Sequence, residues 1–153
     1  AEMNAFSQLL RAHEGSNPDL IAQFDANEQV LVHHAKFSRI HRALKPYLID
    51  MAALNAERGI PVTRPLFYHY DGERERKEST EYLLGRDLLV APIIREGAKS
   101  REVYFPDDRW ISIWNGKEYG RGCAEIDAPI GTVPVFYRKN SEYSEIFEKL
   151  KEA

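Results

Sequence analysis

Paired carboxylates are the first arrangement in this sequence that could catalyse a reaction. Asp107 adjoins Asp108, and Asp71 lies two residues before Glu73. Two carboxyl groups can serve as general acid and base, or as acid and nucleophile. Both pairs lie beside prolines or glycines, however, where aspartate commonly bonds to the backbone of a turn. We therefore expect ordinary turn residues at these positions.

Histidines and the single cysteine offer two further chemistries. His33 and His34 are adjacent, and His41 follows His34 by seven residues, so a helix would place His34 and His41 on one face. No carboxylate completes a zinc pattern of the HExxH type around them. Cys123 has no histidine nearby in the sequence that could activate its thiol. The sequence predicts neither a metal site nor a nucleophilic cysteine.

Composition narrows the class of protein. The 153 residues are 43% hydrophobic with a formal net charge of −3, which predicts a globular fold with a real core. The basic residues are scattered, so no nucleic-acid partner is expected. No apolar stretch approaches the roughly 20 residues that span a bilayer, so no membrane partner is expected either. A lone cysteine fits a reducing compartment, and we expect a cytoplasmic location.

One long amphipathic helix is predicted between Asn27 and Glu57. Its apolar positions recur at spacings of three, four and seven, as a single buried helix face requires. They are Val30, Phe37, Ile40, Leu44, Tyr47, Leu48, Met51 and Leu54. Pro46 lies inside this pattern and predicts a bend or a break. Gly59 predicts the end of the helix, because glycine readily adopts the left-handed conformation.

Short β-type runs follow Gly59. They are Leu66–Tyr70, Asp87–Ile94, Arg101–Phe105, Trp110–Trp114, Glu118–Tyr119, Cys123–Ile126 and Val133–Tyr137. Prolines and glycines separate these runs at intervals typical of an antiparallel sandwich. The charged run from Asp71 to Glu78 predicts a solvated loop, with a contact to a neighbouring subunit or domain as the alternative.

Local patterns add three details. Asn115–Gly116 predicts a tight hairpin turn. Trp110, Ser112 and Trp114 alternate along one run and should share a sheet face. A final helix capped near residue 141 is predicted from one apolar stripe. The stripe consists of Tyr143, Ile146, Phe147 and Leu150.

Four stretches, in this order, resemble family 31 glycoside hydrolases, which include α-glucosidases, α-xylosidases and sulfoquinovosidases. They are Glu2–His13, Leu44–Leu48, Gly59–Phe67 and Leu83–Pro92. The likeness is greatest to bacterial sulfoquinovosidases in four segments, which are Arg11–Gly15, Tyr82–Asp87, Ala128–Gly131 and Pro134–Arg138. The resemblance covers nearly the whole chain and implies the C-terminal part of such an enzyme.

The resemblance implies a fold of class α/β plus all-β. Residues 1–60 would be the last strand and long helix of a (β/α)8 TIM barrel, and residues 61–153 an antiparallel β-sandwich with a closing helix. The remainder of the catalytic barrel would come from the same or a companion polypeptide. Alone, the chain would expose the apolar face of its long helix, so an oligomer is possible.

The implied activity is hydrolysis of α-glycosides with retention, on α-sulfoquinovosides or α-glucosides, without a metal or organic cofactor. Such enzymes need two carboxyl groups about 5 Å apart. In this family both are aspartates on earlier barrel strands, and the groups that recognise the sulfonate are also upstream. The resemblance therefore implies no catalytic residue in this chain and no activity of the chain alone.

The resemblance does imply substrate-binding residues. His13 matches a family histidine that bonds a sugar hydroxyl, and an imidazole suits this because one nitrogen donates while the other accepts. Arg11 would lie on the same side of the last strand, and Glu14 could orient either neighbour. Arg64 and Asp87 are expected instead in a buried ion pair or a strand-end bond.

A non-catalytic carbohydrate-binding or interaction module is the alternative. Trp110, Trp114, Tyr119 or Tyr104 would then form an exposed platform against the C–H faces of a sugar. Exposure of these rings distinguishes the two hypotheses.

Overall fold

A computed structural model describes residues 1–13, 16–17 and 23–153. In chain order the elements are α1 (Glu2–Ala5), α2 (Glu28–Ala43), α3 (Lys45–Arg58), β1 (Thr63–Arg64), the 3-10 helix η2 (Leu66–Tyr68), α4 (Glu73–Lys77), β2 (Tyr82–Leu84), β3 (Leu88–Val90), β4 (Ser100–Phe105), β5 (Trp110–Ser112), β6 (Glu118–Tyr119), β7 (Gly122–Asp127), β8 (Val135–Arg138), α5 (Ser144–Glu148) and η3 (Lys149–Glu152).

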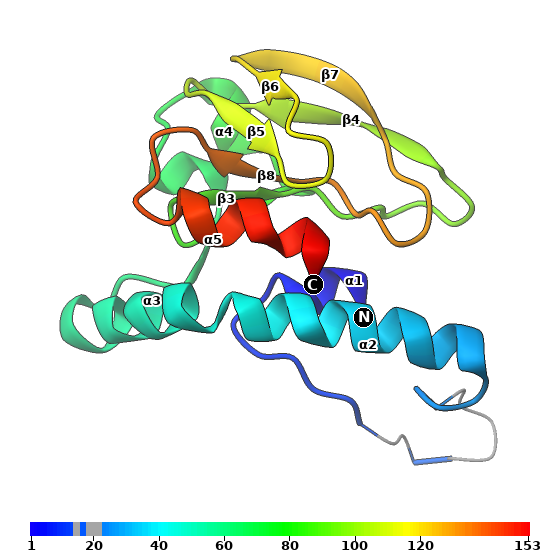
Figure 1. Ribbon diagram of the computed structural model, residues 1–153. Coiled ribbons are helices and arrows are strands. Elements are labelled where there is room, and N and C mark those ends of the chain that lie inside the picture. Colours follow the sequence, from blue (N-terminus) through cyan, green and yellow to red (C-terminus); the bar gives the residue numbers. More distant parts are fainter. Residues whose placement is uncertain (14–15, 18–22) are drawn as a thin grey trace.

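Two antiparallel sheets form the β-part of the molecule. The larger has the strand order β1-β2-β3-β8-β5-β6, and β4 pairs with β7 in the smaller. Figure 1 shows α2 and α3 end to end along one side, with α5 between them and the larger sheet. This arrangement confirms the predicted antiparallel sandwich.

The larger sheet is buried on both faces. Side chains alternate along each strand, so Leu83 and Leu84 point into different cores. One core lies against the helices and includes Phe37 and Tyr47. The other lies against the β4–β7 pair and includes Trp110. Burial on both faces explains why the central strands are apolar throughout instead of alternating.

The helical prediction is confirmed in its three main features. Asn27 caps α2, because its Oδ1 accepts a hydrogen bond from the Val30 amide at 2.9 Å. Leu44 alone separates α2 from α3, and Pro46 lies in the first turn of α3, where its missing N–H is not needed. Gly59 ends α3 with φ 66°. None of the described helices is long and apolar enough to cross a membrane.

The closing helix is confirmed. A turn at Asn115–Gly116 does join β5 to β6, but it is longer than the tight hairpin predicted, and Asn115 does not adopt a positive φ. Phe147 and Leu150 are fully buried on α5 and η3. The predicted cap near residue 141 is wrong, because Tyr143 is the N-cap of α5 and its side chain makes no capping bond. The Ser141 hydroxyl instead accepts a hydrogen bond from the Tyr143 amide at 3.1 Å, in the turn before the helix. Gly116 has φ 70° in the turn between β5 and β6, which its lack of a side chain permits.

The strand predicted over Leu66–Tyr70 is wrong, because the chain forms η2 there. After Pro65, the amides of Tyr68 and His69 bond back to the carbonyls three residues earlier, at 3.1 Å each. The strands β1 and β2 were not predicted, since two or three residues are too few to display an alternating pattern.

The solvated loop predicted over 71–78 is wrong as well. α4 forms in its middle, and Glu75 is buried there, where its carboxylate accepts a hydrogen bond from the Tyr104 hydroxyl at 2.6 Å. A charged run can therefore pack against a sheet when one of its acids finds a buried donor.

The last barrel strand expected before His13 is not observed. Residues 7–13 are not part of a strand, and the described chain begins with α1 instead. A strand needs a neighbour to pair its backbone groups, and no described segment of this chain pairs with residues 7–13. The structure thus supports the β-sandwich of the predicted fold, while the barrel unit of residues 1–60 remains a prediction.

Candidate functional site

The segment before residue 14 carries the predicted sugar-binding side chains. Ala5 and Phe6 are fully buried in the core beside the helices, and the chain then runs along the surface. Arg11 Nη2 lies 3.5 Å from His13 Nδ1, and both side chains are exposed. This distance is at the limit of a hydrogen bond. The structure brings Arg11 and His13 together, while Glu14 lies outside the described residues.

A surface hollow of about 300 Å³ adjoins these two side chains. Its lining includes Arg11 and His13, together with His33 and His34 of α2. The ring of Phe24 lies 5.3 Å from that of His34. A cation, imidazole nitrogens and an aromatic ring therefore surround one hollow, a set that suits a hydroxylated ligand.

For the histidines of α2, metal binding was the only role considered from the sequence, and no metal site was predicted. Among the described residues, no group of three His, Cys, Asp or Glu side chains could hold a metal ion. His41 donates from Nδ1 to the Ala5 carbonyl at 3.0 Å. Helical spacing puts Val30, His33 and His34 on one side of α2, a signal that could have indicated a shared surface.

The described lining of this hollow lacks the groups for glycoside cleavage. It contains no aspartate or glutamate. Retaining hydrolysis needs two carboxyl groups about 5 Å apart. The described lining therefore offers hydrogen-bonding groups but no pair of carboxyl groups.

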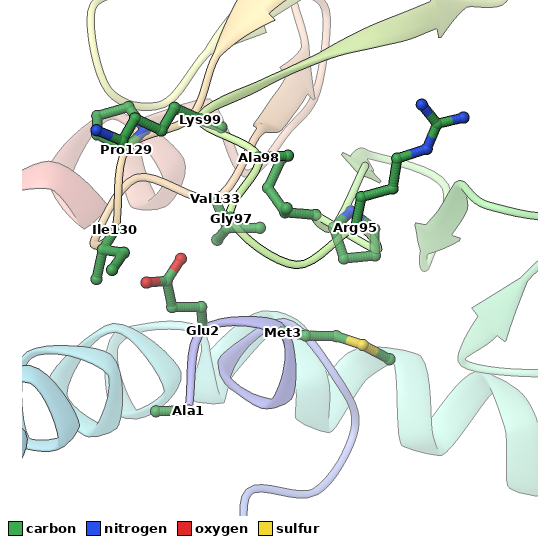
Figure 2. A pocket seen from close by; sticks show the side chains of 13 residues that line it. Ala1, Glu2, Met3, Arg95, Gly97, Ala98, Lys99, Pro129, Ile130 and Val133 are labelled. Atoms are coloured by element: carbon green, nitrogen blue, oxygen red, sulfur yellow. The ribbon is translucent and has the colours of Figure 1, made fainter.

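A second cavity of about 750 Å³ lies beside α1 (Figure 2). It separates α1 from the loops that carry residues 92–99 and 128–133, and its walls include Met3, Ile93, Ile130 and Val133. Glu2 is the one carboxylate in this lining. A single acid without an adjacent partner does not constitute an acid–base pair.

Two charged side chains of the β-part, Arg64 and Asp87, are structural, as expected from the sequence. Arg64, 2% exposed, donates to the Pro61 carbonyl at 2.6 Å and to His69 Nε2 at 2.7 Å. Burial and the neighbouring guanidinium lower the pKa of His69 to about 4, so His69 stays a neutral acceptor. Asp87 pairs with Arg138 instead of Arg64.

The aromatic side chains form no open platform. Trp110 is fully buried and Tyr104 is 6% exposed. Trp114 does not share the face of Trp110 as expected, because β5 ends before it and its indole N–H donates to a backbone carbonyl 2.7 Å away in the other core. One face of Tyr119 stacks on Phe105 at 4.7 Å. These contacts argue against a sugar-stacking surface at these four rings.

A family model matches the β-part of the chain. It is described as the C-terminal domain of glycosyl hydrolase family 31 and covers residues 59–141. Since this match spans more than half of the chain, the chain belongs to glycosyl hydrolase family 31.

Curated relatives and solved structures extend the match to nearly the whole chain. The chain is 42% identical over 151 residues to a sulfoquinovosidase of Escherichia coli strain K12, covering 98% of the chain and 22% of that protein. It is 40% identical over 153 residues to a sulfoquinovosidase of Agrobacterium fabrum, covering 98% of the chain and 23% of that protein. A family 31 sulfoquinovosidase from E. rectale, solved with an aza-sugar inhibitor, superposes with a TM-score of 0.95 at 39% identity over 99% of the chain. The chain spans less than a quarter of the length of these proteins.

Proposed function

We propose that this chain is the C-terminal part of a retaining α-glycosidase, in which the β-sandwich supports a catalytic barrel. The observation that carries the proposal is family 31 membership together with the hollow that Arg11 and His13 line. Residues 1–60 would complete the barrel, and residues 61–153 would form the supporting domain. The rest of the barrel would come from the same or a companion polypeptide.

The catalytic carboxylates are proposed to lie on barrel strands before residue 1. Active-site groups of such barrels cluster at the C-terminal ends of the strands, so several strands must contribute. The hollow beside His13 has donors and acceptors but no described carboxylate, which fits a binding role at the rim. The 153 residues alone should be inactive.

His13, Arg11 and Glu14 are the proposed substrate-binding residues. Exposed Arg11 and His13 side chains can both reach a ligand in the hollow. The contact from Arg11 engages His13 Nδ1 as an acceptor, which leaves Nε2–H free to donate to a sugar hydroxyl. Such a bond can strengthen in an oxocarbenium-like transition state.

The proposed substrates are α-sulfoquinovosides, with α-glucosides as the alternative. Two similar proteins, at 42% and 40% identity, are sulfoquinovosidases. The side chains that would recognise the sulfonate are expected upstream of residue 1. The assignment of α-sulfoquinovosides as substrates therefore rests on similarity alone.

Hydrolysis assays test this proposal. Release of nitrophenol from aryl α-sulfoquinovoside, α-glucoside and α-xyloside is measured for the 153 residues and for an extended chain with a full barrel. We expect turnover only by the extended chain, fastest on the sulfoquinovoside. Turnover by the 153 residues would place the catalytic groups within them and overturn the proposal.

The proposed binding residue is tested in the same extended chain. His13→Ala should lower kcat/KM about 10–100-fold, because a buried sugar hydroxyl loses its partner. His13→Gln should restore part of this loss, since its amide can still donate. An unchanged kcat/KM in His13→Ala would remove His13 from the site.

A further inference from the structure

The position of Arg11 and His13 depends on contacts made by residues 1–6. α1 has four residues, too few to be stable as an isolated helix. Residues 7–13 pair with no described strand, and the Ser7 hydroxyl makes only short-range bonds to the carbonyls of Asn4 and Leu9, at 2.7 and 2.8 Å. Anchors on α1 and Phe6 must therefore set where the segment leaves the core.

Tyr82 of β2 provides the first anchor. Its hydroxyl donates to the Phe6 carbonyl at 3.0 Å, although the two residues are 76 positions apart. Phe6 itself is fully buried. Burial raises the pKa of Tyr82 to about 12, so the hydroxyl remains a donor across the neutral range. Arg11 follows this fixed carbonyl by only five residues.

Glu2 provides the second anchor. Its Oε1 accepts a hydrogen bond from the Gly131 amide at 2.7 Å, and His33 Nε2 lies 3.3 Å from the same oxygen. The Gly131 carbonyl accepts in turn from Lys36 Nζ at 2.7 Å. Figure 2 shows the Glu2 side chain pointing from α1 toward the loop of Pro129 and Ile130. The β7–β8 loop is thereby joined to both α1 and α2.

We propose that Tyr82 and Glu2 are positioning residues through which the β-sandwich holds the Arg11–His13 segment at the sugar site. The inference rests on the function proposed above. Neither side chain lines the hollow beside His13. Tyr82 acts through the Phe6 backbone, while Glu2 acts through α1 and also contacts His33, which lines the hollow. A displacement of about 1 Å in a binding group can cost up to roughly 100-fold in rate, so these remote bonds affect turnover.

Tyr82→Phe in the extended chain is the first test, because it removes the hydroxyl and keeps the packed ring. We expect kcat/KM for the preferred aryl α-glycoside to fall about 5–10-fold. Tyr137→Phe is the matched control, since the Tyr137 hydroxyl donates its hydrogen bond to Glu148 of α5, at 3.2 Å, and not to a residue of 1–13. The control should lose similar thermal stability and keep its kcat/KM. Equal kcat/KM in the two variants would overturn the inference.

A double-mutant cycle separates positioning from general stability. In a His13→Ala background, Tyr82→Phe should cause no further fall in kcat/KM, because the group that it positions is gone. An equal fall in both backgrounds would indicate a merely structural role and overturn the inference. If His13→Ala alone has no effect, the sugar-site assignment fails and this inference fails with it. If His13→Ala is impaired while Tyr82→Phe is not, the positioning role alone fails.

Glu2 gives an independent test of the same role. Glu2→Ala removes the acceptor of the Gly131 amide and should lower kcat/KM about 5-fold. Glu2→Gln keeps an acceptor oxygen and should restore most of the activity. Glu2→Ala with unchanged kcat/KM would remove Glu2 from the positioning pair.

Discussion

Arg138 directs both Nε and Nη2 at one carboxylate oxygen of Asp87, at 3.0 and 2.7 Å. The Arg138 amide also donates to the Asp87 carbonyl at 2.8 Å. These bonds tie the end of β8 to the residue before β3, next to the pair Leu88 and Tyr137. They set the register between the two central strands of the larger sheet.

Loss of the Asp87 charge should therefore destabilise the fold. Asp87→Asn leaves Arg138, whose side chain is 20% exposed, with the longer 3.9 Å contact to Asp108 as its remaining ion pair in the described structure. We expect the free energy of unfolding to fall by about 1.5–3 kcal/mol. Urea denaturation measures the change. Glu73→Gln is the control, because its ion pair with Lys77 is exposed and should be worth less than about 0.5 kcal/mol. Similar losses in both variants would contradict a special role for Asp87.

A crowded glycine gives a second prediction. Gly85 has φ 61°, and a Cβ there would lie 2.6 Å from Tyr47 Cζ. The Tyr47 hydroxyl is fixed by donating to the Leu84 carbonyl at 2.7 Å and accepting from the Asp87 amide at 3.1 Å. Gly85→Ala should therefore lower the free energy of unfolding by about 3 kcal/mol or more, because it introduces both backbone strain and overpacking.

Gly97→Ala separates these two contributions. Gly97 has φ 72°, but a methyl group added there would meet no atom within 4 Å, so this variant should cost only about 1 kcal/mol of backbone strain. Thermal denaturation of the two variants compares them directly. Equal shifts in Tm would mean that the Tyr47 side chain moves aside at little cost.

The parts of the fold that could be predicted from the sequence are those with strong local patterns. An interruption near Pro46 and the stop at Gly59 were predicted because helical periodicity, proline and glycine each act locally, and the observed break lies at Leu44. The strand predicted at Leu66–Tyr70 failed because the proline before it starts a turn. β1 and β2 exist through pairing with each other and with β3, which no two- or three-residue pattern reveals.

The candidate site was predictable only in part, for a different reason. Arg11 and His13 were assigned through family resemblance, since their spacing alone has no distinctive chemistry. His33 and His34 line the same hollow because long-range contacts hold residues 2–6 against α2, β2 and the β7–β8 loop, and such contacts cannot be read from local sequence.

Exposed apolar side chains at the start of α2 predict self-association of the 153-residue chain. Leu31 is 44% exposed and Val32 60% exposed, so together they leave an apolar surface on the first turns. Light scattering at high concentration should detect oligomers, and Leu31→Glu with Val32→Glu should shift them toward monomer. Arg39→Glu, at an exposed position of the same helix, should leave the association unchanged. A monomeric parent chain would contradict the prediction.

Glu81 should make stability depend on pH. Its side chain is 1% exposed, and Oε1 accepts from the Tyr104 amide at 2.9 Å and from Arg101 Nη2 at 3.0 Å. Within the described structure, Oε2 is buried without a hydrogen-bond partner. Burial outweighs the attraction of Arg101 and raises the pKa of Glu81 to about 7, with a smaller contribution from Glu78.

The sign of the effect follows from proton binding. Between the ordinary carboxyl pKa of about 4.5 and the folded value of about 7, the folded chain keeps a proton that the unfolded chain has released. Glu81 therefore lowers the free energy of unfolding as pH rises through this window. His69, whose pKa is lowered to about 4, has the opposite effect below pH 6.5, so the parent curve alone does not isolate Glu81.

The difference between parent and Glu81→Gln isolates this group. Glutamine keeps an acceptor for Tyr104 and Arg101 but cannot ionise. The free energy of unfolding of the variant minus that of the parent should rise by about 2–3 kcal/mol between pH 5 and pH 8. Urea denaturation at several pH values measures this gain, and Glu125→Gln, at an exposed position of β7, should retain the parent slope. A constant difference between parent and Glu81→Gln would mean that Arg101 keeps Glu81 ionised throughout this range.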